Sequence, residues 1–145
     1  MPTQDVEEYL EAILDIVNEK DLAKTNDLSQ LLKVSPSSVT EVIQRLSKND
    51  LIIYEPYKGV KLTDKGLTIA TKIKRKHRVI EVFLKDYLHI NPDIIHDEAC
   101  KMEHCISDEI TDALCRLLGG PERCPCGKEI PKCSSDKECK DCVRR

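Results

Sequence analysis

The chain has 145 residues, of which 34% are charged and 40% hydrophobic, and its formal net charge is −3. This composition is that of an ordinary globular protein and excludes a chain that is mostly disordered. No apolar run approaches the roughly 18–20 residues of a membrane span, so we expect no membrane partner. Residues 1–5 lack the basic and apolar segments of a signal peptide, and we therefore expect a cytoplasmic location.

Three helices are expected first along the chain. Residues 4–18 predict an amphipathic helix, because apolar side chains recur there at helical spacing. Asn26-Asp27 caps a second helix over residues 28–32. The turn at residues 35–38 leads into a third helix, which begins at Ser37 or Ser38 and ends at about residue 49. Helix, short turn and helix in this order predict a helix-turn-helix.

A hairpin and a long helix follow. Residues 51–54 and 60–63 are strand-like runs separated by the turn signal Lys58-Gly59, which predicts a two-stranded wing. From residue 64 a helix is expected to run to Tyr87 as a linker, because neither proline nor glycine interrupts it after Gly66. The expected fold is therefore mainly α: a winged helix-turn-helix with a two-stranded wing and a long linker helix, followed by a helical domain.

Two shorter helices are expected after the linker. One starts at Asn91-Pro92-Asp93 and carries Cys105, and the last is capped by Ser107-Asp108 and ends at Leu118, before Gly119-Gly120-Pro121. We expect Cys105 and Cys115 to be small core residues. The boundaries of the domains are predicted at 1–66, 67–121 and 122–145, the last being a cysteine-rich tail.

The charges are unevenly distributed. Residues 52–78 are strongly basic and residues 79–123 strongly acidic. Such a pattern favours a polyanion-binding part followed by a cation-binding part, although two solvated faces are an equally good interpretation.

The third helix carries the candidate DNA contacts. In a helix-turn-helix the second helix of the motif enters the major groove, where short hydroxyl side chains allow close approach to phosphates and longer polar ones reach base edges. An ordinary cap and turn is the alternative interpretation of the serines. The candidates on this helix and at the wing tip are Ser35, Ser37, Ser38, Thr40, Glu41, Gln44, Arg45, Lys48 and Lys58.

A metal-binding pattern lies in the acidic part. On a helix, Cys100, Glu103 and His104 fall at i, i+3 and i+4 and so share one face. Thiolate, carboxylate and imidazole together suit Fe, Ni, Co, Zn or Mn rather than Mg or Ca. Three ligands leave the shell incomplete, so a ligand from elsewhere would couple metal binding to tertiary structure. Further candidates, each of which alone could be a solvated side chain, are His77, Glu81, His96, Glu8 and Glu11.

The tail carries five cysteines in 19 residues, at Cys124, Cys126, Cys133, Cys139 and Cys142. In a chain without a signal peptide such a cluster favours zinc or an iron–sulfur cluster over disulfides. Redox-active thiols and a merely flexible tail are the alternatives.

Over residues 4–121 the chain resembles the diphtheria toxin repressor family, which includes the manganese transport regulators. The resemblance rests on Glu8-Tyr9-Leu10, on residues 35–40 and 57–66, on Lys76-His77-Arg78-Val79-Ile80-Glu81 and above all on residues 96–104. It implies a metal-activated repressor that is a homodimer through the segment after the linker helix, and not an enzyme.

The resemblance also assigns ligands. It implies an activating site of Cys100, Glu103 and His104, completed by Glu8 from the first helix, and an ancillary site of His77, Glu81 and His96. In the manganese regulators the ligands instead include those at Glu8, Glu11 and His77.

Cys100 is similar to the iron branch of this family and Glu8 to the manganese branch, and the SH3-like domain of many iron regulators is not expected here. We therefore expect Fe(II) or Mn(II), with Ni, Co or Zn as substitutes in vitro. The expected function is repression of metal-uptake genes by a metal-activated homodimer that binds double-stranded operator DNA. The alternative is a regulator that senses redox state or an iron–sulfur cluster through the tail.

Overall fold

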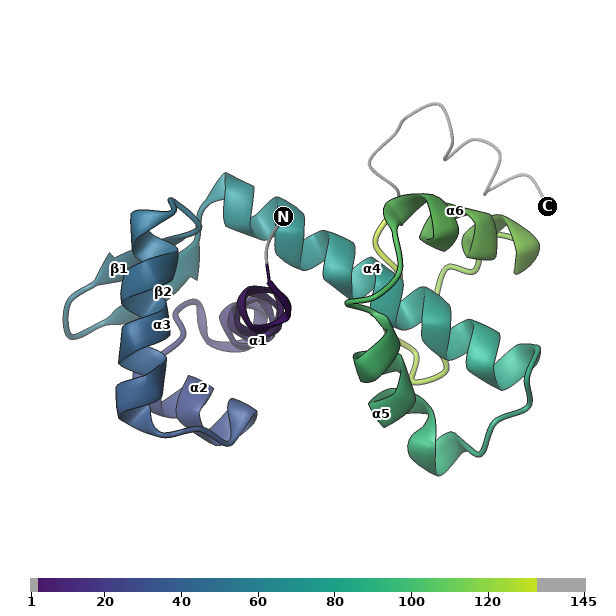
Figure 1. Cartoon of the computed structure of the whole chain (residues 1–145), viewed down its shortest axis with the longest axis horizontal. Coiled ribbons are helices and arrows are strands. Elements are labelled where there is room, and N and C mark those ends of the chain that lie inside the picture. The colour runs from purple at the N-terminus through teal and green to yellow at the C-terminus, as the bar shows by residue number, and fades with distance from the viewer. Residues whose placement is uncertain (1–2, 133–145) are drawn as a thin grey trace. The chain divides into compact units, whose positions relative to one another are not determined.

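The computed structural model describes residues 3–132. Within this range the chain forms six helices and one two-stranded antiparallel sheet, in the order α1 (Gln4–Lys20), α2 (Thr25–Leu32), α3 (Pro36–Lys48), β1 (Ile52–Glu55), β2 (Gly59–Leu62), α4 (Asp64–Asp86), α5 (Pro92–Met102) and α6 (Asp108–Leu117) (Figure 1). This order confirms the mainly α fold with a winged helix-turn-helix. None of the helices in this range has both the length and the apolar character that crossing a membrane requires.

Two compact units make up the structure, one ending at Thr71 and the other beginning at Lys72, and α4 contributes to both. In the first unit the buried residues of α1, α2, α3 and the sheet form one apolar core, with Leu10, Ile13, Leu28, Leu46 and Val60 among its fully buried side chains. The sheet pairs Ile52 with Leu62 and Tyr54 with Val60.

Capping interactions explain where the second and third helices begin. The side chain of Asp27 accepts from the backbone N–H of Lys24 at 3.2 Å, so α2 starts at Thr25, three residues before the expected start. The Ser35 hydroxyl accepts from the backbone N–H of Ser38, also at 3.2 Å, and Pro36 occupies the first turn, which favours helix initiation. Ser35 rather than Ser37 or Ser38 is therefore the N-cap of α3.

The second unit is held together by apolar contacts and ion pairs. Ile80 and Leu84 of α4 pack with Ile95 and Ala99 of α5. Val79 packs with Cys115 of α6, which is buried as expected. Cys105 was also expected in the core but is exposed, because α5 ends at Met102 and leaves Cys105 in the following turn.

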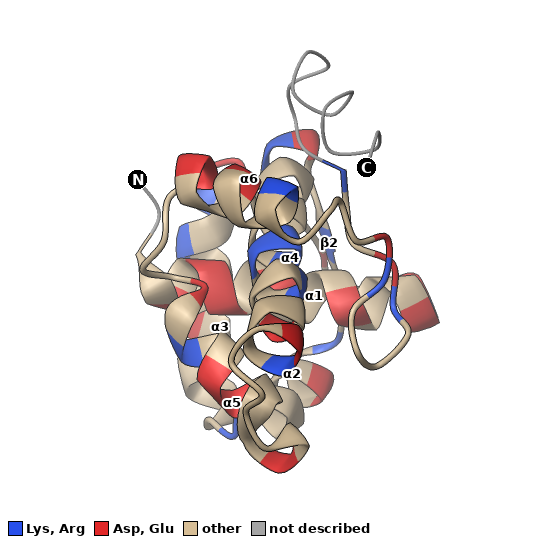
Figure 2. Cartoon of the chain, turned by 90° about the vertical axis from the view of Figure 1, so that its right-hand side faces the viewer, with Lys and Arg blue, Asp and Glu red and all other residues tan. Residues whose placement is uncertain are grey.

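Ion pairs join α4 to α6 within this unit. Arg75 of α4 lies 2.6 Å from Asp112 of α6, and both side chains are largely buried. Lys72 and Lys76 pair with Asp108 at 3.4 and 3.3 Å. Figure 2 colours the basic residues of α4 blue and the acidic residues of α6 red. The basic residues at the middle of α4 are thus paired with acidic residues of the same unit.

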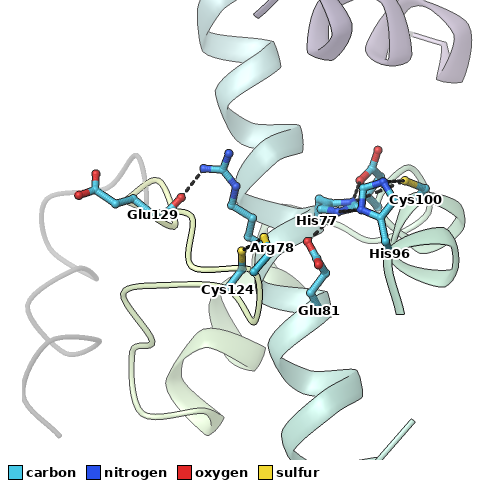
Figure 3. A network of polar contacts seen from close by, with 9 residues as sticks. His77, Arg78, Glu81, His96, Cys100, Cys124 and Glu129 are labelled. Atoms are coloured by element: carbon cyan, nitrogen blue, oxygen red, sulfur yellow. Dashed lines mark hydrogen bonds and ion pairs between the residues drawn. The ribbon is translucent and has the colours of Figure 1, made fainter. Parts of the chain in front are cut away.

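The first part of the expected tail folds back onto α4 and α6. Ile130 packs against the cluster of Val79 and Cys115. Backbone hydrogen bonds from Cys124 to Lys128 and from Ile130 to Glu122 shape the loop, and the Arg78 guanidinium donates to the carbonyl oxygen of Glu129 (Figure 3). The remaining tail cysteines, Cys133, Cys139 and Cys142, lie outside the described residues.

Candidate functional site

His77, on α4, is the centre of a buried polar cluster in the second unit. Its Nδ1 lies 2.6 Å from Oε2 of Glu103. Its Nε2 lies 2.7 Å from Oε1 of Glu81 and 3.1 Å from Nδ1 of His96 (Figure 3). The imidazole is buried, as are the carboxylates of Glu81 and Glu103. Two buried carboxylates thus meet a buried imidazole, and the exposed His96 joins them from the surface.

Cys100 joins this cluster from α5. Its Sγ lies 3.8 Å from Nδ1 of His77 and 3.7 Å from Nε2 of His96. His96 and Cys100 are four residues apart on one helix, so both face α4. The ligand atoms of His77, His96 and Cys100 all lie within 4.8 Å of one another, which is close enough for one metal ion. This group combines a residue expected in the activating site with two expected in the ancillary site.

Glu103 and His104 lie just beyond the helix that was expected to carry them. Because α5 ends at Met102, Glu103 is its C-cap. Oε1 of Glu103 lies 3.3 Å from Nε2 of His104, and both side chains are almost fully buried. Glu103 therefore bridges His77 and His104. A buried carboxylate is costly unless it is paired, so these two imidazoles stabilise its charge.

The electrostatics of the cluster fix the protonation of His77. Burial alone would lower the pKa of His77, but its hydrogen bonds with Cys100, Glu103 and Glu81 raise it to about 12. Burial would raise the pKa of Glu81, yet the neighbouring His77 lowers it. In this arrangement His77 is an imidazolium that donates to a carboxylate from each ring nitrogen. A metal ligand must be a neutral imidazole, so a metal ion bound by His77 takes the place of a proton.

A second group of ligand atoms lies beside the first. The carboxylate of Glu81 and the thiols of Cys124 and Cys126 are also within 4.8 Å of one another. The two sulfur atoms are 2.7 Å apart, and both cysteines are free. Burial raises the pKa of Cys124, and so does its hydrogen bond with Cys126. Partial burial would raise the pKa of Cys126, but its hydrogen bond with Cys124 lowers it. Either sulfur atom can be the donor of this hydrogen bond.

This second group differs from the sequence prediction, which assigned Glu81 to the ancillary site and the two cysteines to the tail. The docked loop brings the cysteines to α4. No periodicity within either segment signals such a contact, because it depends on the packing of Ile130 and on the Arg78 hydrogen bond.

Glu8 and Glu11 lie on α1 of the first unit, where the side-chain amide of Gln4 donates to Oε1 of Glu8 at 3.1 Å. Their expected role as metal ligands stays a prediction.

The candidate DNA contacts lie on the exposed side of α3. Val39, Ile43 and Leu46 are buried on one face of α3, and the opposite face is exposed to solvent. Ser35 and Thr40 also serve the helix itself, since the Thr40 hydroxyl donates to the carbonyl of Pro36. The exposed candidates are Ser35, Ser37, Ser38, Thr40, Glu41, Gln44, Arg45, Lys48 and, in the wing, Lys58.

Comparison with known families matches both units. A model described as the N-terminal DNA binding domain of iron dependent repressors matches residues 1–60, and one described as their metal binding and dimerisation domain matches residues 63–132. The chain is 41% identical, over 77% of its length and 90% of the relative's, to an uncharacterised helix-turn-helix transcriptional regulator of Methanocaldococcus jannaschii. It is 35% identical, over 81% of its length and 83% of the relative's, to the transcriptional regulator MntR of Geobacillus thermodenitrificans.

Solved structures of similar proteins point to the same family. A manganese-dependent transcriptional repressor in complex with manganese has a TM-score of 0.83 and 32% identity, and ScaR with bound Zn²⁺ has a TM-score of 0.76 and 38% identity. Both alignments cover 90% of this chain but only 60% of the other chain. The chain therefore spans 60% of the length of these solved regulators.

Proposed function

The chain belongs to the iron-dependent repressor family, and we propose that it represses transcription by binding operator DNA as a homodimer when a divalent transition metal occupies the cluster around His77. This membership, through matches to 1–60 and 63–132, confirms the resemblance to the diphtheria toxin repressor family. The family consists of transcriptional regulators, not enzymes. The observation that carries the proposal is that the ligand atoms of His77, His96 and Cys100 lie within 4.8 Å of one another in the unit that matches the metal binding and dimerisation domain. Glu103 contacts His77 and His104 beside them.

The donor set suits a borderline transition metal. Imidazoles, one thiol and a carboxylate fit Fe(II), Co(II), Ni(II) or Zn(II), and a thiolate is less suited to Mn(II). As the resemblance implies, we propose Fe(II) or Mn(II) as the activating ion. We favour Fe(II), because the Cys100 sulfur lies within reach of two imidazoles and a thiolate suits Fe(II) better than Mn(II). Glu8 or Glu11, as the resemblance implies, would complete the shell from the first unit.

A second metal ion is proposed at Glu81, Cys124 and Cys126. Two thiols and a carboxylate suit Zn(II) or Fe(II), and four-coordinate zinc would leave one position for another ligand. This proposal replaces an iron–sulfur cluster at these two cysteines. The comparisons do not favour the alternative of a redox-sensing or cluster-sensing regulator. One similar structure is described as a manganese-dependent transcriptional repressor and another as ScaR with bound Zn²⁺.

The proposed regulation is a coupling free energy between the metal and the DNA. A metal ion held by one ring nitrogen of His77 would take the place of the proton and the hydrogen bond at that nitrogen, and the other ring N–H would still donate to a carboxylate. A ligand from α1 would then fix the first unit, so that two copies of α3 in a dimer match successive major grooves about 34 Å apart. Without this constraint the spacing would vary and operator binding would be weaker.

Exposed apolar residues support a homodimer through the second unit. Ile110 and Leu117 lie seven residues apart on α6, so they share a face, and each is about half exposed. Substitution of Leu117 by Lys is expected to shift the chain to a monomer in sedimentation, whereas Leu31→Lys in the first unit is not.

The proposed function is tested by selecting duplexes from a random DNA library with the full chain under anaerobic Fe(II), and in parallel under Mn(II). We expect a two-fold symmetric sequence to be enriched and its binding to be lost when a chelator is added. Enrichment that is the same with and without the chelator would overturn the metal-dependence. No enrichment under either metal would overturn the assignment as an operator-binding repressor.

A further inference from the structure

The tip of the wing contains a tyrosine in a conformation that side chains rarely adopt. The backbone N–H of Lys58 donates to the carbonyl of Glu55 at 3.1 Å, which closes a four-residue turn. Pro56 is the second residue of this turn and Tyr57 the third, with φ +65°. A proline followed by a residue with positive φ is the pattern of a type II turn, whose third position favours glycine or asparagine. Tyr57 therefore occupies a position at which an aromatic residue destabilises the turn.

Packing within the fold does not compensate for this strain at Tyr57. Its side chain is 103% exposed relative to the reference value, the largest exposure among the large apolar side chains of the described residues. It buries no area within the chain, so intramolecular packing does not offset the backbone strain. The presence of a strained residue with an exposed aromatic ring is better explained by contact with another molecule than by a contribution to folding stability.

The wing that presents Tyr57 is firmly attached to its unit. Val60 and Ala23 exchange two backbone hydrogen bonds of 2.8 and 2.9 Å, which joins β2 to the segment after α1. Gly59, with φ +140°, lies so close that a Cβ atom would come within 2.6 Å of the Ala23 carbonyl oxygen. β1 in turn packs against α3 in the same unit. Tyr57 is thus held at a fixed position relative to the exposed face of α3.

The charges beside Tyr57 suit a nucleic acid. Lys58 is exposed and has the next position in the turn, whereas Lys61 is already paired with Glu55 at 3.3 Å. An aromatic ring beside a free-standing lysine can pack on deoxyribose and base edges while the ammonium meets a phosphate. On this basis, and resting on the proposed DNA-binding function, we propose that Tyr57 is a DNA-contacting residue whose ring enters the minor groove next to the major groove that α3 reads.

The backbone strain makes this proposal sharply testable. In Tyr57→Gly and Tyr57→Asn the new residue tolerates positive φ, so the unfolding midpoint of the metal-loaded chain should stay the same or rise. DNA affinity should nevertheless fall at least about five-fold, as for the loss of other aromatic contacts with nucleotides. Tyr57→Phe should bind normally, because it keeps the ring. The probes are the duplex selected from the random library and an unrelated duplex of equal length.

Lys58→Ala serves as the matched control on the same turn. It removes a phosphate contact, so it should reduce the slope of log affinity against log salt by about one, whereas Tyr57→Gly should leave this slope unchanged. If Tyr57→Gly and Tyr57→Asn bind within two-fold of the wild-type chain, Tyr57 is not a DNA contact and the proposal is overturned, while the proposed function stands. If the wild-type metal-loaded chain binds neither duplex, both are overturned.

Discussion

His77 and Glu103 are 26 residues apart in the chain, yet Nδ1 of the imidazole lies 2.6 Å from Oε2 of the carboxylate. The second ring nitrogen of His77 makes a similar contact of 2.7 Å with Glu81. One protonated imidazole therefore satisfies two buried carboxylates, which would otherwise repel each other. The same three side chains are metal ligands by type, so the hydrogen-bonded cluster and a metal-bound one are alternatives that use the same atoms.

Removal of His77 should destabilise the metal-free chain strongly. His77→Gln removes the imidazolium that lies 2.6 Å from the Glu103 carboxylate and 2.7 Å from that of Glu81, and breaking a buried charge pair costs about 3–5 kcal/mol. The measurement is urea unfolding in the presence of a chelator. Glu98→Gln is the control, because it removes a 2.9 Å ion pair with Lys101 that is exposed. Equal midpoints for the two variants would show that the cluster does not stabilise the second unit.

The raised pKa of His77 gives a pH dependence with a definite sign. Because this pKa is raised from 6.5 to about 12 on folding, the charged imidazole contributes stability that is fully present below pH 6.5 and is lost as the pH rises through about 12. Metal binding at neutral pH must then release the His77 proton. Titration with Fe(II) or Zn(II) in weakly buffered solution should acidify it by at least one proton per bound ion. A titration without proton release would contradict this account.

The ion pairs between α4 and α6 should differ in strength. Asp112→Ala should cost about 3 kcal/mol, because it leaves the buried Arg75 guanidinium without its partner. Asp108→Ala should cost less than about 1 kcal/mol, because its pairs with Lys72 and Lys76 are partly exposed.

The pH dependence of the Asp108 pairs supplies a second check. Burial would raise the pKa of Asp108, but Lys76 and Lys72 lower it. Its contribution to stability is therefore present above the normal carboxyl pKa and is lost as the pH falls through the lowered value. Thermal unfolding of Asp112→Ala and Asp108→Ala at neutral and acidic pH tests whether the first variant loses more stability than the second. Equal losses of stability at neutral pH would contradict this prediction.

Metal stoichiometry separates the two proposed sites. The anaerobically purified chain should bind two ions, and Cys126→Ser should bind one while retaining metal-dependent DNA binding at a higher metal concentration. A chain that ends after Lys132 should still bind two, because Glu81, Cys124 and Cys126 lie before that point. Loss of all metal response in the shortened chain, or an iron–sulfur spectrum in the intact one, would restore the alternative of a sensor in the tail.

Local patterns in the sequence predicted the winged helix-turn-helix, because helix spacing, caps and the wing turn are properties of short segments. They also found His77, Glu81, His96, Cys100, Glu103 and His104, which all lie in the second unit. Their partition into groups could not be predicted, since it depends on how α5 ends and on how the loop carrying Cys124 packs. Tyr57 was missed although its signal was local: Pro56 before it and Gly59 after it mark a turn in which a tyrosine must adopt positive φ.

The most direct test of the central claim is the dissociation constant for the selected duplex with saturating Fe(II) and with a chelator, in the wild-type chain and in Glu103→Gln. The substitution keeps the shape of the side chain but replaces the negatively charged carboxylate, a metal ligand by type, with a neutral amide. We predict that metal tightens binding by the wild-type chain by about 5- to 150-fold, the usual range of allosteric coupling. Glu103→Gln should bind the duplex with the affinity of the chelated wild-type chain whether or not metal is present. A wild-type affinity that metal does not change, or an undiminished metal response in Glu103→Gln, would contradict the account.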